Sequence, residues 1–192
     1  MRESNSMSVR LARDLSDFMV ITAIRSAVYL AEQDCPIDEE FDGNDFVAAH
    51  FIGYIGSEPV ACLRVRFFGE FAKVERLAVR HQYRRSRISF KLVQASVDYV
   101  KRKGFRKIYG QAQDRLVNFW AHFGAKPLPN SRKIVFSDFS YTEMVLEIPP
   151  SSDAITLQSD PYVIIRPEGD WDRPGVLDLS SQRTVTSPLR TP

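Results

Sequence analysis

Three arginines lie between a predicted strand and a predicted helix in the middle of the chain. Residues 73–79 are β-rich, and from Ile88 onward apolar side chains recur at helical spacing. The short polar segment that joins them contains Arg84, Arg85 and Arg87. A helix N-terminus presents unpaired backbone N–H groups and the positive end of the helix dipole. The sequence therefore predicts a binding site for phosphate or another anion at this corner.

Acidic and basic residues are segregated along the chain. Residues 80–107 contain ten Lys or Arg and a single acid, whereas residues 32–45 contain seven Asp or Glu and no base. This segregation indicates a positive site for an anionic ligand beside a negative site for a cationic one, such as a phosphate-bearing donor and an amine acceptor. Two solvated charged surfaces are the alternative. A nucleic-acid site is disfavoured because the basic stretch lacks interleaved exposed aromatic residues and matches no nucleic-acid motif.

Length and composition favour one domain of ordinary size. The chain has 192 residues, 44% of them hydrophobic, which is enough for a full core. Two cysteines, Cys35 and Cys62, are too few for a disulfide framework, and the three histidines are scattered, so no metal site is expected. The N-terminal residues lack the apolar stretch of a secretory signal, and no run is long enough to span a bilayer. We therefore expect a cytoplasmic protein with no membrane partner.

Hydrophobic periodicity and turn residues predict the elements that position these groups. A strand at 9–12 precedes a helix capped by Asp14 or Ser16, and the acidic segment after it is predicted to be a loop or broken helix. The order is typical of the α/β (α+β) class, with a mixed twisted central sheet of about six or seven strands flanked by helices. The remaining elements are a hairpin at 50–55 and 60–68, the central strand and helix, a strand at 107–111, a helix at 114–124, and an antiparallel pair at 132–137 and 140–148.

The composition changes after Pro149. Residues 150–192 are rich in Pro, Ser, Asp and Thr. We therefore predict one domain at 1–149 and a C-terminal extension at 150–192, partly ordered through Tyr162–Ile165 and Trp171.

The central strand, loop and helix resemble motif A of the GNAT (Gcn5-related N-acetyltransferase) superfamily. In that family the strand backbone holds the pantetheine arm of acetyl-CoA, and the loop N–H groups hold its pyrophosphate. The family's loop usually has small residues where this chain has Arg87 and Ser89, because glycine lets backbone approach phosphate closely. The resemblance rests on Leu77-Ala78-Val79, Tyr83-Arg84, Ile88 and Leu92, which match L-A-V-x-x-x-Y-R-x-x-x-I-x-x-x-L.

This resemblance implies a set of residues that bind acetyl-CoA or another acyl-CoA. Side-chain forks of the loop arginines could bind the CoA phosphates, or they could dock the acidic surface of an acyl carrier protein. The implied donor-binding residues are Leu77, Ala78, Val79, Arg84, Arg85, Ser86, Arg87, Ile88, Ser89 and Asn118.

Other segments resemble the ElaA-type acetyltransferases within this superfamily. Arg25, the Asp42/Asp45 pair, Arg64 and Arg76 also resemble positions of the autoinducer synthases, which take acyl chains from acyl carrier protein. The expected substrate-binding residues are Arg25, Asp42, Asp45, Arg64 and Trp120, and a capped, solvated loop is the alternative for the two aspartates. The ElaA-like segments are Arg25-x-x-Val28-Tyr29-x-x-Glu32-Gln33-x-Cys35-Pro36, Asp42-x-x-Asp45, Gly110-Gln111-Ala112-Gln113 and Asn118-Phe119-Trp120-x-x-Phe123-Gly124.

Acyl transfer from a thioester to an amine needs a neutral amine, donors for the developing oxyanion and a route for protonating the thiolate. Because the family often places a carboxylate in the central strand, Glu75 is expected to be the general base. An ion pair with Arg76 or Lys73 is the alternative. Strand alternation places Glu75, Leu77 and Val79 on one face.

Trp120 occupies the position where the family usually has a tyrosine general acid. An indole releases no proton at working pH, so Trp120 is expected to pack or to line the acyl pocket. A thiol with a pKa of about 8.5 leaves without much help. Tyr141 is either a substitute acid or an ordinary strand aromatic.

The sequence therefore predicts an N-acyltransferase that moves an acyl group from acetyl-CoA, or a related acyl thioester, to a small primary amine. Two alternatives stay open: an N-acyltransferase fed by acyl carrier protein, and a degenerate GNAT fold that binds a ligand or partner without turnover. The acceptor, the acyl length and the oligomeric state, including a homodimer, are also left open.

Overall fold

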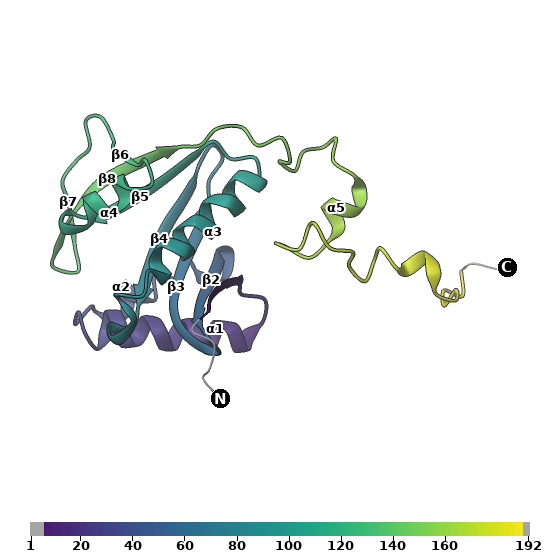
Figure 1. The fold of residues 1–192 in the computed structure, drawn as a ribbon, viewed down its shortest axis with the longest axis horizontal. Coiled ribbons are helices and arrows are strands. Elements are labelled where there is room, and N and C mark those ends of the chain that lie inside the picture. The colour runs from purple at the N-terminus through teal and green to yellow at the C-terminus, as the bar shows by residue number, and fades with distance from the viewer. Residues whose placement is uncertain (1–5, 190–192) are drawn as a thin grey trace.

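The computed structural model describes residues 6–189, which form one eight-stranded sheet with helices on both faces (Figure 1). The strand order is β1-β2-β3-β4-β5-β8-β6, with β7 paired to β8. All pairs are antiparallel except β4 with β5. The predicted α/β (α+β) class is confirmed, and the unpredicted strand β6 has only two residues. The strands are Met7–Leu11 (β1), Ala49–Ile55 (β2), Glu58–Phe67 (β3), Ala72–Val79 (β4), Lys107–Gln113 (β5), Lys126–Pro127 (β6), Ile134–Phe136 (β7) and Phe139–Glu147 (β8).

The first helix, α1 (Leu15–Arg25), begins at Asp14, whose side chain accepts a hydrogen bond from the Asp17 N–H at 2.9 Å. It continues as a π-helical turn, η1 (Ser26–Leu30). The acidic segment that follows is a broken helix, as expected. The other helical elements are α2 (Ile37–Glu40), η2 (Asp45–Val47), η3 (His81–Tyr83), α3 (Ile88–Arg102), η4 (Asp114–Leu116), α4 (Val117–Ala121), α5 (Pro161–Ile165) and η5 (Ser180–Gln182).

The two faces of the sheet bury separate apolar clusters. Helix α3 covers one face and α1 the other (Figure 1). Because both helices carry apolar residues at a spacing of three and four, each presents a continuous stripe to the strands. The buried stripe of α3 is Ile88, Leu92, Val93 and Val100, and that of α1 and η1 is Ile21, Ile24 and Val28.

The start of α3 sits close to β2 at Gly53. A Cβ atom added to this glycine would lie 2.9 Å from Ile88 Cγ1. Any larger residue would therefore push the first turn of α3 away from the sheet. The absence of a side chain at Gly53 is what lets the helix N-terminus approach the end of β4.

The C-terminal extension packs on the last turn of α3. The ring of Trp171 stacks on Tyr99 with 5.3 Å between the centroids, and Trp171 belongs to the same buried cluster as the α3 stripe. Lys103 pairs with Glu168 at 2.6 Å. Within the predicted anchor Tyr162–Ile165, Val163 contacts this cluster, whereas the other three residues stay about half exposed. The remainder of the extension runs away from the sheet (Figure 1).

Candidate active site

Strands β4 and β5 form a V-shaped opening. They pair only where Ala72–Val74 lies beside Ile108–Gly110. Beyond these residues β4 continues to pair with β3, and β5 continues to pair with β8. The facing backbone edges of residues 75–79 and 111–113 are therefore left without a neighbouring strand. Figure 1 shows the two arms diverging toward the start of α3.

A β-bulge bends β4 where the V opens. The pairs Arg64↔Glu75 and Cys62↔Ala78 leave two residues of β4, Arg76 and Leu77, opposite one residue of β3. Arg76 has a φ of +53°, a conformation that residues other than glycine seldom adopt. A bulge of this kind bends the strand and increases its twist. It therefore turns β4 away from β5.

The bulge also overturns the predicted alternation along β4. Leu77 and Val79 pack against the cluster under α3, and Ala78 is buried under α1. Glu75 instead pairs with Arg64, which lies two residues from Cys62 on the α1 face of β3. The expectation that Glu75 shares a face with Leu77 and Val79 was wrong, because the extra residue at the bulge shifts the alternation by one.

The loop after β4 ends in a residue with left-handed backbone. Arg87 has a φ of +65° and immediately precedes α3, and its carbonyl accepts the Phe90 N–H at 3.1 Å. This is the first of the two positions at which small residues were expected. Arg84, Arg85 and Arg87 are exposed. Arg84 pairs with Glu32 and donates to the Val79 carbonyl at 3.2 Å, whereas Arg85 and Arg87 have no ion-pair partner among residues 6–189.

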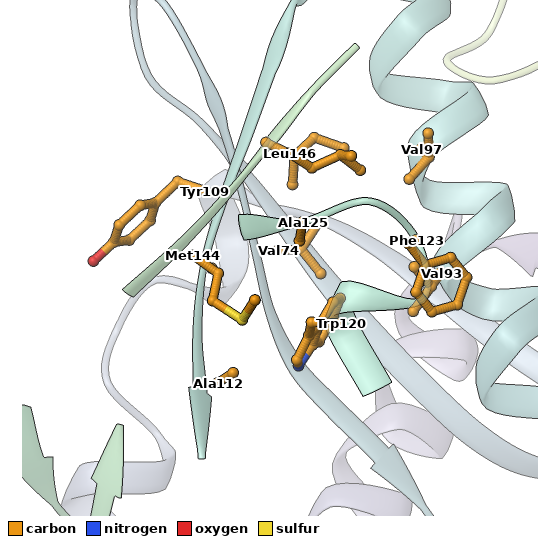
Figure 2. Close-up of a pocket in the computed structure, with 12 residues that line it drawn as sticks. Val74, Val93, Val97, Tyr109, Ala112, Trp120, Phe123, Ala125, Met144 and Leu146 are labelled. Atoms are coloured by element: carbon orange, nitrogen blue, oxygen red, sulfur yellow. The ribbon is translucent and has the colours of Figure 1, made fainter. Parts of the chain in front are cut away.

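Behind the apex of the V lies a small apolar pocket (Figure 2). Its free volume is about 20 Å³, close to the space of one water molecule. Trp120 of α4 lines it, while Asn118 of the same helix is exposed. The other walls come from β4, β5, β8, α3 and the turn after α4, chiefly Val74, Val93, Ala112, Phe123 and Met144.

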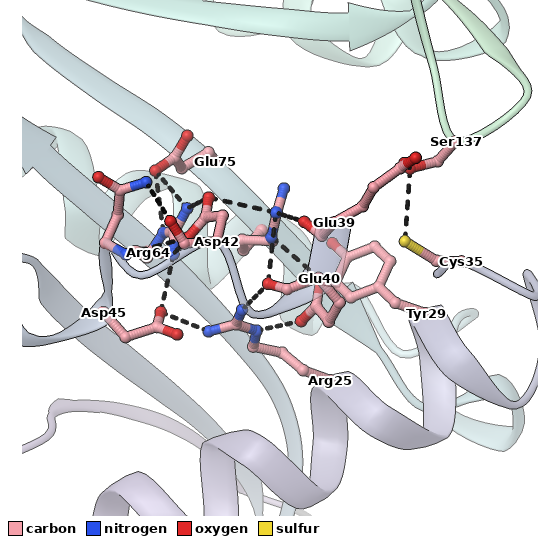
Figure 3. A network of polar contacts seen from close by, with 12 residues as sticks. Arg25, Tyr29, Cys35, Glu39, Glu40, Asp42, Asp45, Arg64, Glu75 and Ser137 are labelled. Carbon is pink, nitrogen blue, oxygen red and sulfur yellow. Dashed lines mark hydrogen bonds and ion pairs between the residues drawn. The ribbon is translucent and has the colours of Figure 1, made fainter. Parts of the chain in front are cut away.

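Below the bulge, arginines and acids form a buried ion-pair network (Figure 3). Arg25 and Arg64 have exposed fractions of 1% and 0%. Both donate to Asp45 Oδ1, at 2.6 and 2.8 Å respectively. Arg64 also donates to Asp42 at 2.6 Å, and Arg25 pairs with Glu40. The structure therefore brings together four of the five predicted substrate residues, Arg25, Asp42, Asp45 and Arg64, but as partners of one another.

This pairing governs the charge of the acidic segment. Burial opposes ionisation of Asp45, but the hydrogen bonds from Arg64 and Arg25 outweigh it and lower the pKa of Asp45. For Glu40 burial prevails over the attraction of Arg25 and raises its pKa. Asp42 keeps an exposed side-chain fraction of 26%, against 9% for Asp45. The network thus pairs three of the seven acids at residues 32–45, Glu40, Asp42 and Asp45, with arginines.

Glu75 is held by Arg64 and Lys73, and Arg66 lies 3.9 Å from it. Its Oε1 accepts from Arg64 Nε at 2.9 Å, and its Oε2 lies 2.7 Å from Lys73 Nζ. The ion pair with Lys73 considered from the sequence is therefore present. Arg76 instead reaches the acidic segment, where its Nε lies 3.0 Å from Glu40 Oε2 and its Nη2 donates to the Glu39 carbonyl at 2.7 Å.

The two arms of the V are joined at their open end. The turn between β7 and β8 places Ser137 Oγ 3.3 Å from Cys35 Sγ and 2.5 Å from Glu39 Oε2 (Figure 3). Glu39 is held to β4 by Arg76. Tyr141 stacks on Phe136 at 3.8 Å and accepts a hydrogen bond from the Gln113 amide at 3.4 Å.

Sequence reasoning singled out Arg25 as a substrate residue but missed its structural role, and it missed the role of the Tyr29 hydroxyl. Arg25 lies four residues after Ile21 on the buried stripe of α1, and a basic residue on such a stripe indicates a buried acidic partner, here Glu40. Tyr29 was expected on the core-facing stripe of the first helix and formed part of the ElaA-like resemblance, but no role was predicted for its hydroxyl. Its hydroxyl donates to the Leu77 carbonyl at 3.0 Å, a contact between residues 48 positions apart that local pattern does not reveal.

Residues 6–189 contain no group of three or more His, Cys, Asp or Glu that could hold a metal ion. None of the helices described there is long and apolar enough to cross a membrane.

The comparisons with known proteins define the family. Residues 18–125 match the model of the Acetyltransferase (GNAT) family, and the chain belongs to this family. This range holds both arms of the V and the arginine loop. A Bacillus subtilis (strain 168) relative, named Putative acetyltransferase BSU40680, is 34% identical over 112 residues, which are 56% of this chain and 76% of the relative. The predicted GNAT membership and enzyme class are thereby confirmed.

Solved structures share the fold. ElaA of Escherichia coli superposes with a TM-score of 0.65 at 22% identity, covering 73% of this chain and 99% of ElaA. An acyl-CoA N-acyltransferase from Pseudomonas aeruginosa gives a TM-score of 0.66 at 19% identity, over 73% of this chain and 99% of that protein.

Proposed function

We propose that the enzyme transfers an acyl group from acetyl-CoA, or a closely related short acyl-CoA, to a small primary amine. The observation that carries the proposal is the separation of β4 from β5 beside the N-terminus of α3. An extended pantetheine arm carries amides that can pair with an exposed strand edge, as an added strand would. Its phosphates would then lie at the arginine loop.

In this proposal the CoA phosphates are bound both by arginine side chains and by the backbone at the start of α3. Arg85 and Arg87 are exposed and have no ion-pair partner within the part of the chain that the structure describes, so their guanidinium groups could form forked contacts with phosphate oxygens. Arg84 already pairs with Glu32 and would contribute less. Ser86, Ile88 and Ser89 would supply the backbone at the start of α3, and the exposed Asn118 of α4 would hold the pantetheine arm.

The small size of the apolar pocket limits the length of the acyl group in this proposal. Because Trp120 and its neighbours leave only about 20 Å³ free, the pocket has no room for a long chain without rearrangement. This favours an acetyl or similarly small group on the donor.

The chemistry requires a base and oxyanion donors. We assign the base to Glu75, which would accept the amine proton directly or through water, and the oxyanion donors to the backbone N–H groups of Leu77–Val79. Trp120 cannot supply a proton, so the thiolate leaves unassisted or with the help of Tyr141. Arg25, Asp45 and Arg64 are enclosed and would act on the acceptor by holding Asp42 and Glu75 in place.

Titration calorimetry with acetyl-CoA, followed by thiol-release assays over a panel of primary amines, tests this function. Saturable binding and amine-dependent thiol release are expected. Glu75→Gln should lower kcat with little change in acetyl-CoA affinity, and an unchanged kcat would remove Glu75 as the base. Binding without thiol release for any amine would indicate the degenerate fold.

The exposed arginines also favour a second candidate, an acyltransferase fed by acyl carrier protein. Arg85 and Arg87 could contact the acidic surface of such a carrier. Salt-sensitive binding to acylated carrier protein, together with no binding to acetyl-CoA, would select this candidate.

A further inference from the structure

Helix α1 changes its winding just before it reaches the bulge of β4. The α-helix ends at Arg25, and Ser26–Leu30 form a π-helical turn. The Ala31 N–H donates to the Ser26 carbonyl at 3.0 Å, the five-residue spacing that defines such a turn. A π-turn contains one extra residue per turn and rotates the side chains that follow it. Such turns occur frequently at functional sites.

The residue displaced by this turn is Tyr29. Its hydroxyl donates to the Leu77 carbonyl oxygen at 3.0 Å, and Figure 3 shows the Tyr29 ring beside the ion-pair network. Leu77 is the second residue of the bulge, where the ladder between β3 and β4 is interrupted. A partly buried carbonyl where the ladder is interrupted is satisfied by another donor, here the Tyr29 hydroxyl. Burial raises the pKa of Tyr29, so the phenol stays protonated and acts only as a donor.

The neighbouring bulge residue is held from the same side. Arg76 has the positive φ, and its guanidinium is fixed by Glu40 at 3.0 Å and by the Glu39 carbonyl at 2.7 Å. Tyr29 fixes the backbone of Leu77, and the acidic segment fixes the side chain of Arg76. Two consecutive residues of β4 are thus anchored to the layer formed by α1, η1 and α2.

We infer that Tyr29 is a positioning residue for acyl transfer: its hydroxyl fixes the peptide that follows Leu77 and so holds the bulge that turns β4 away from β5. The inference rests on the proposed function, because residues 77–79 are the segment assigned there to the thioester. Tyr29 acts through this backbone and does not exchange a proton with the substrates. The π-turn is the device that brings the hydroxyl within reach of the bulge.

Tyr29→Phe tests the inference because it keeps the ring and removes only the hydroxyl. The matched control is Tyr99→Phe, which removes a half-buried hydroxyl that bonds Glu168 at the other end of α3. The expected result is a kcat reduced roughly tenfold, as for one lost hydrogen bond acting on the transition state, with CoA affinity within about twofold of wild type. The Tyr99→Phe variant should keep its kcat.

Hydrogen–deuterium exchange provides a second test of the inference that does not require catalytic activity. Amides in a peptide covering residues 72–83 should exchange faster in Tyr29→Phe than in wild type or in Tyr99→Phe. Unchanged exchange in this peptide, or equal losses of kcat in the two variants, would overturn the positioning role. If the wild type shows no turnover with any donor and amine, the proposed function fails, while the exchange result still decides whether Tyr29 holds the bulge.

Discussion

Arg64 and Asp45 form an ion pair that is almost completely enclosed, with Arg64 Nη1 2.8 Å from Asp45 Oδ1. The same oxygen accepts from Arg25, so one carboxylate satisfies two buried guanidinium groups. Removing one partner of a buried pair leaves charge without compensation. The acidic segment is therefore a structural anchor for β3 and β4 as well as a wall of the site.

Asp45→Asn should destabilise the protein by about 3–5 kcal/mol, because two buried arginines lose a charged acceptor. Urea unfolding at pH 7 measures this loss. The matched control is Glu58→Gln, which removes the exposed partner of Arg80 and should cost less than about 1 kcal/mol. Similar losses in the two variants would contradict the anchoring role of Asp45.

His50 should make the stability depend on pH. It is buried and its Nε2 donates to the Asp45 carbonyl at 2.9 Å, and burial lowers its pKa from 6.5. Below pH 6.5 His50 is protonated in the unfolded chain but still neutral in the folded chain, because its pKa is lowered there. The free energy of unfolding therefore falls as the pH drops, by at most about 1.4 kcal/mol per pH unit. Between pH 7 and 5 the free energy of unfolding should depend less on pH in His50→Gln than in wild type. The exposed-residue control His81→Gln should show the same pH dependence as wild type. A profile identical in His50→Gln and wild type would exclude His50 as the titrating group.

Trp120→Ala should widen the range of acyl donors. Loss of the indole enlarges the apolar pocket, and each methylene that enters it contributes about 0.8 kcal/mol, or roughly fourfold. The ratio of kcat/KM for hexanoyl-CoA to that for acetyl-CoA should rise accordingly in thiol-release assays. Phe119→Ala, on the same helix but outside the pocket lining, should leave the ratio unchanged. A constant ratio in Trp120→Ala would mean that the acyl group lies elsewhere.

Arg87→Ala should weaken CoA binding by roughly tenfold at low ionic strength, as expected for one charge-assisted contact, and by less at high salt. Calorimetry in both conditions measures the effect, with Arg173→Ala on the C-terminal extension as a control for the loss of one exposed positive charge. Equal affinities for wild type and Arg87→Ala would remove Arg87 from the donor site.

The sequence predicted the parts of the fold that depend on local periodicity. The stripe of α3 beginning at Ile88, the hairpin of β2 and β3, and the pair formed by β7 and β8 all follow from spacing within short segments. The N-cap at Asp14 was likewise visible, because capping depends on neighbours three residues away.

The details of the site depend on residues far apart in the chain. Arg76 adopts a positive φ although it is not glycine, because Glu40, 36 positions earlier, holds its side chain. No local pattern predicts this bulge. The sequence predicted the charged residues around Asp45 but not that they pair with one another. They do so because Arg25 and Arg64 are buried and cannot face the solvent.

The stacking of Trp171 on Tyr99 bears on how this enzyme should be handled in the laboratory. A chain cut after residue 149 would lose the indole that covers one side of Tyr99 and the carboxylate that meets Lys103, so an aromatic surface would open at the base of the central helix. Shortened versions chosen from the family boundary alone would therefore tend to self-associate, and crystallisation or assay work is best begun with all 192 residues.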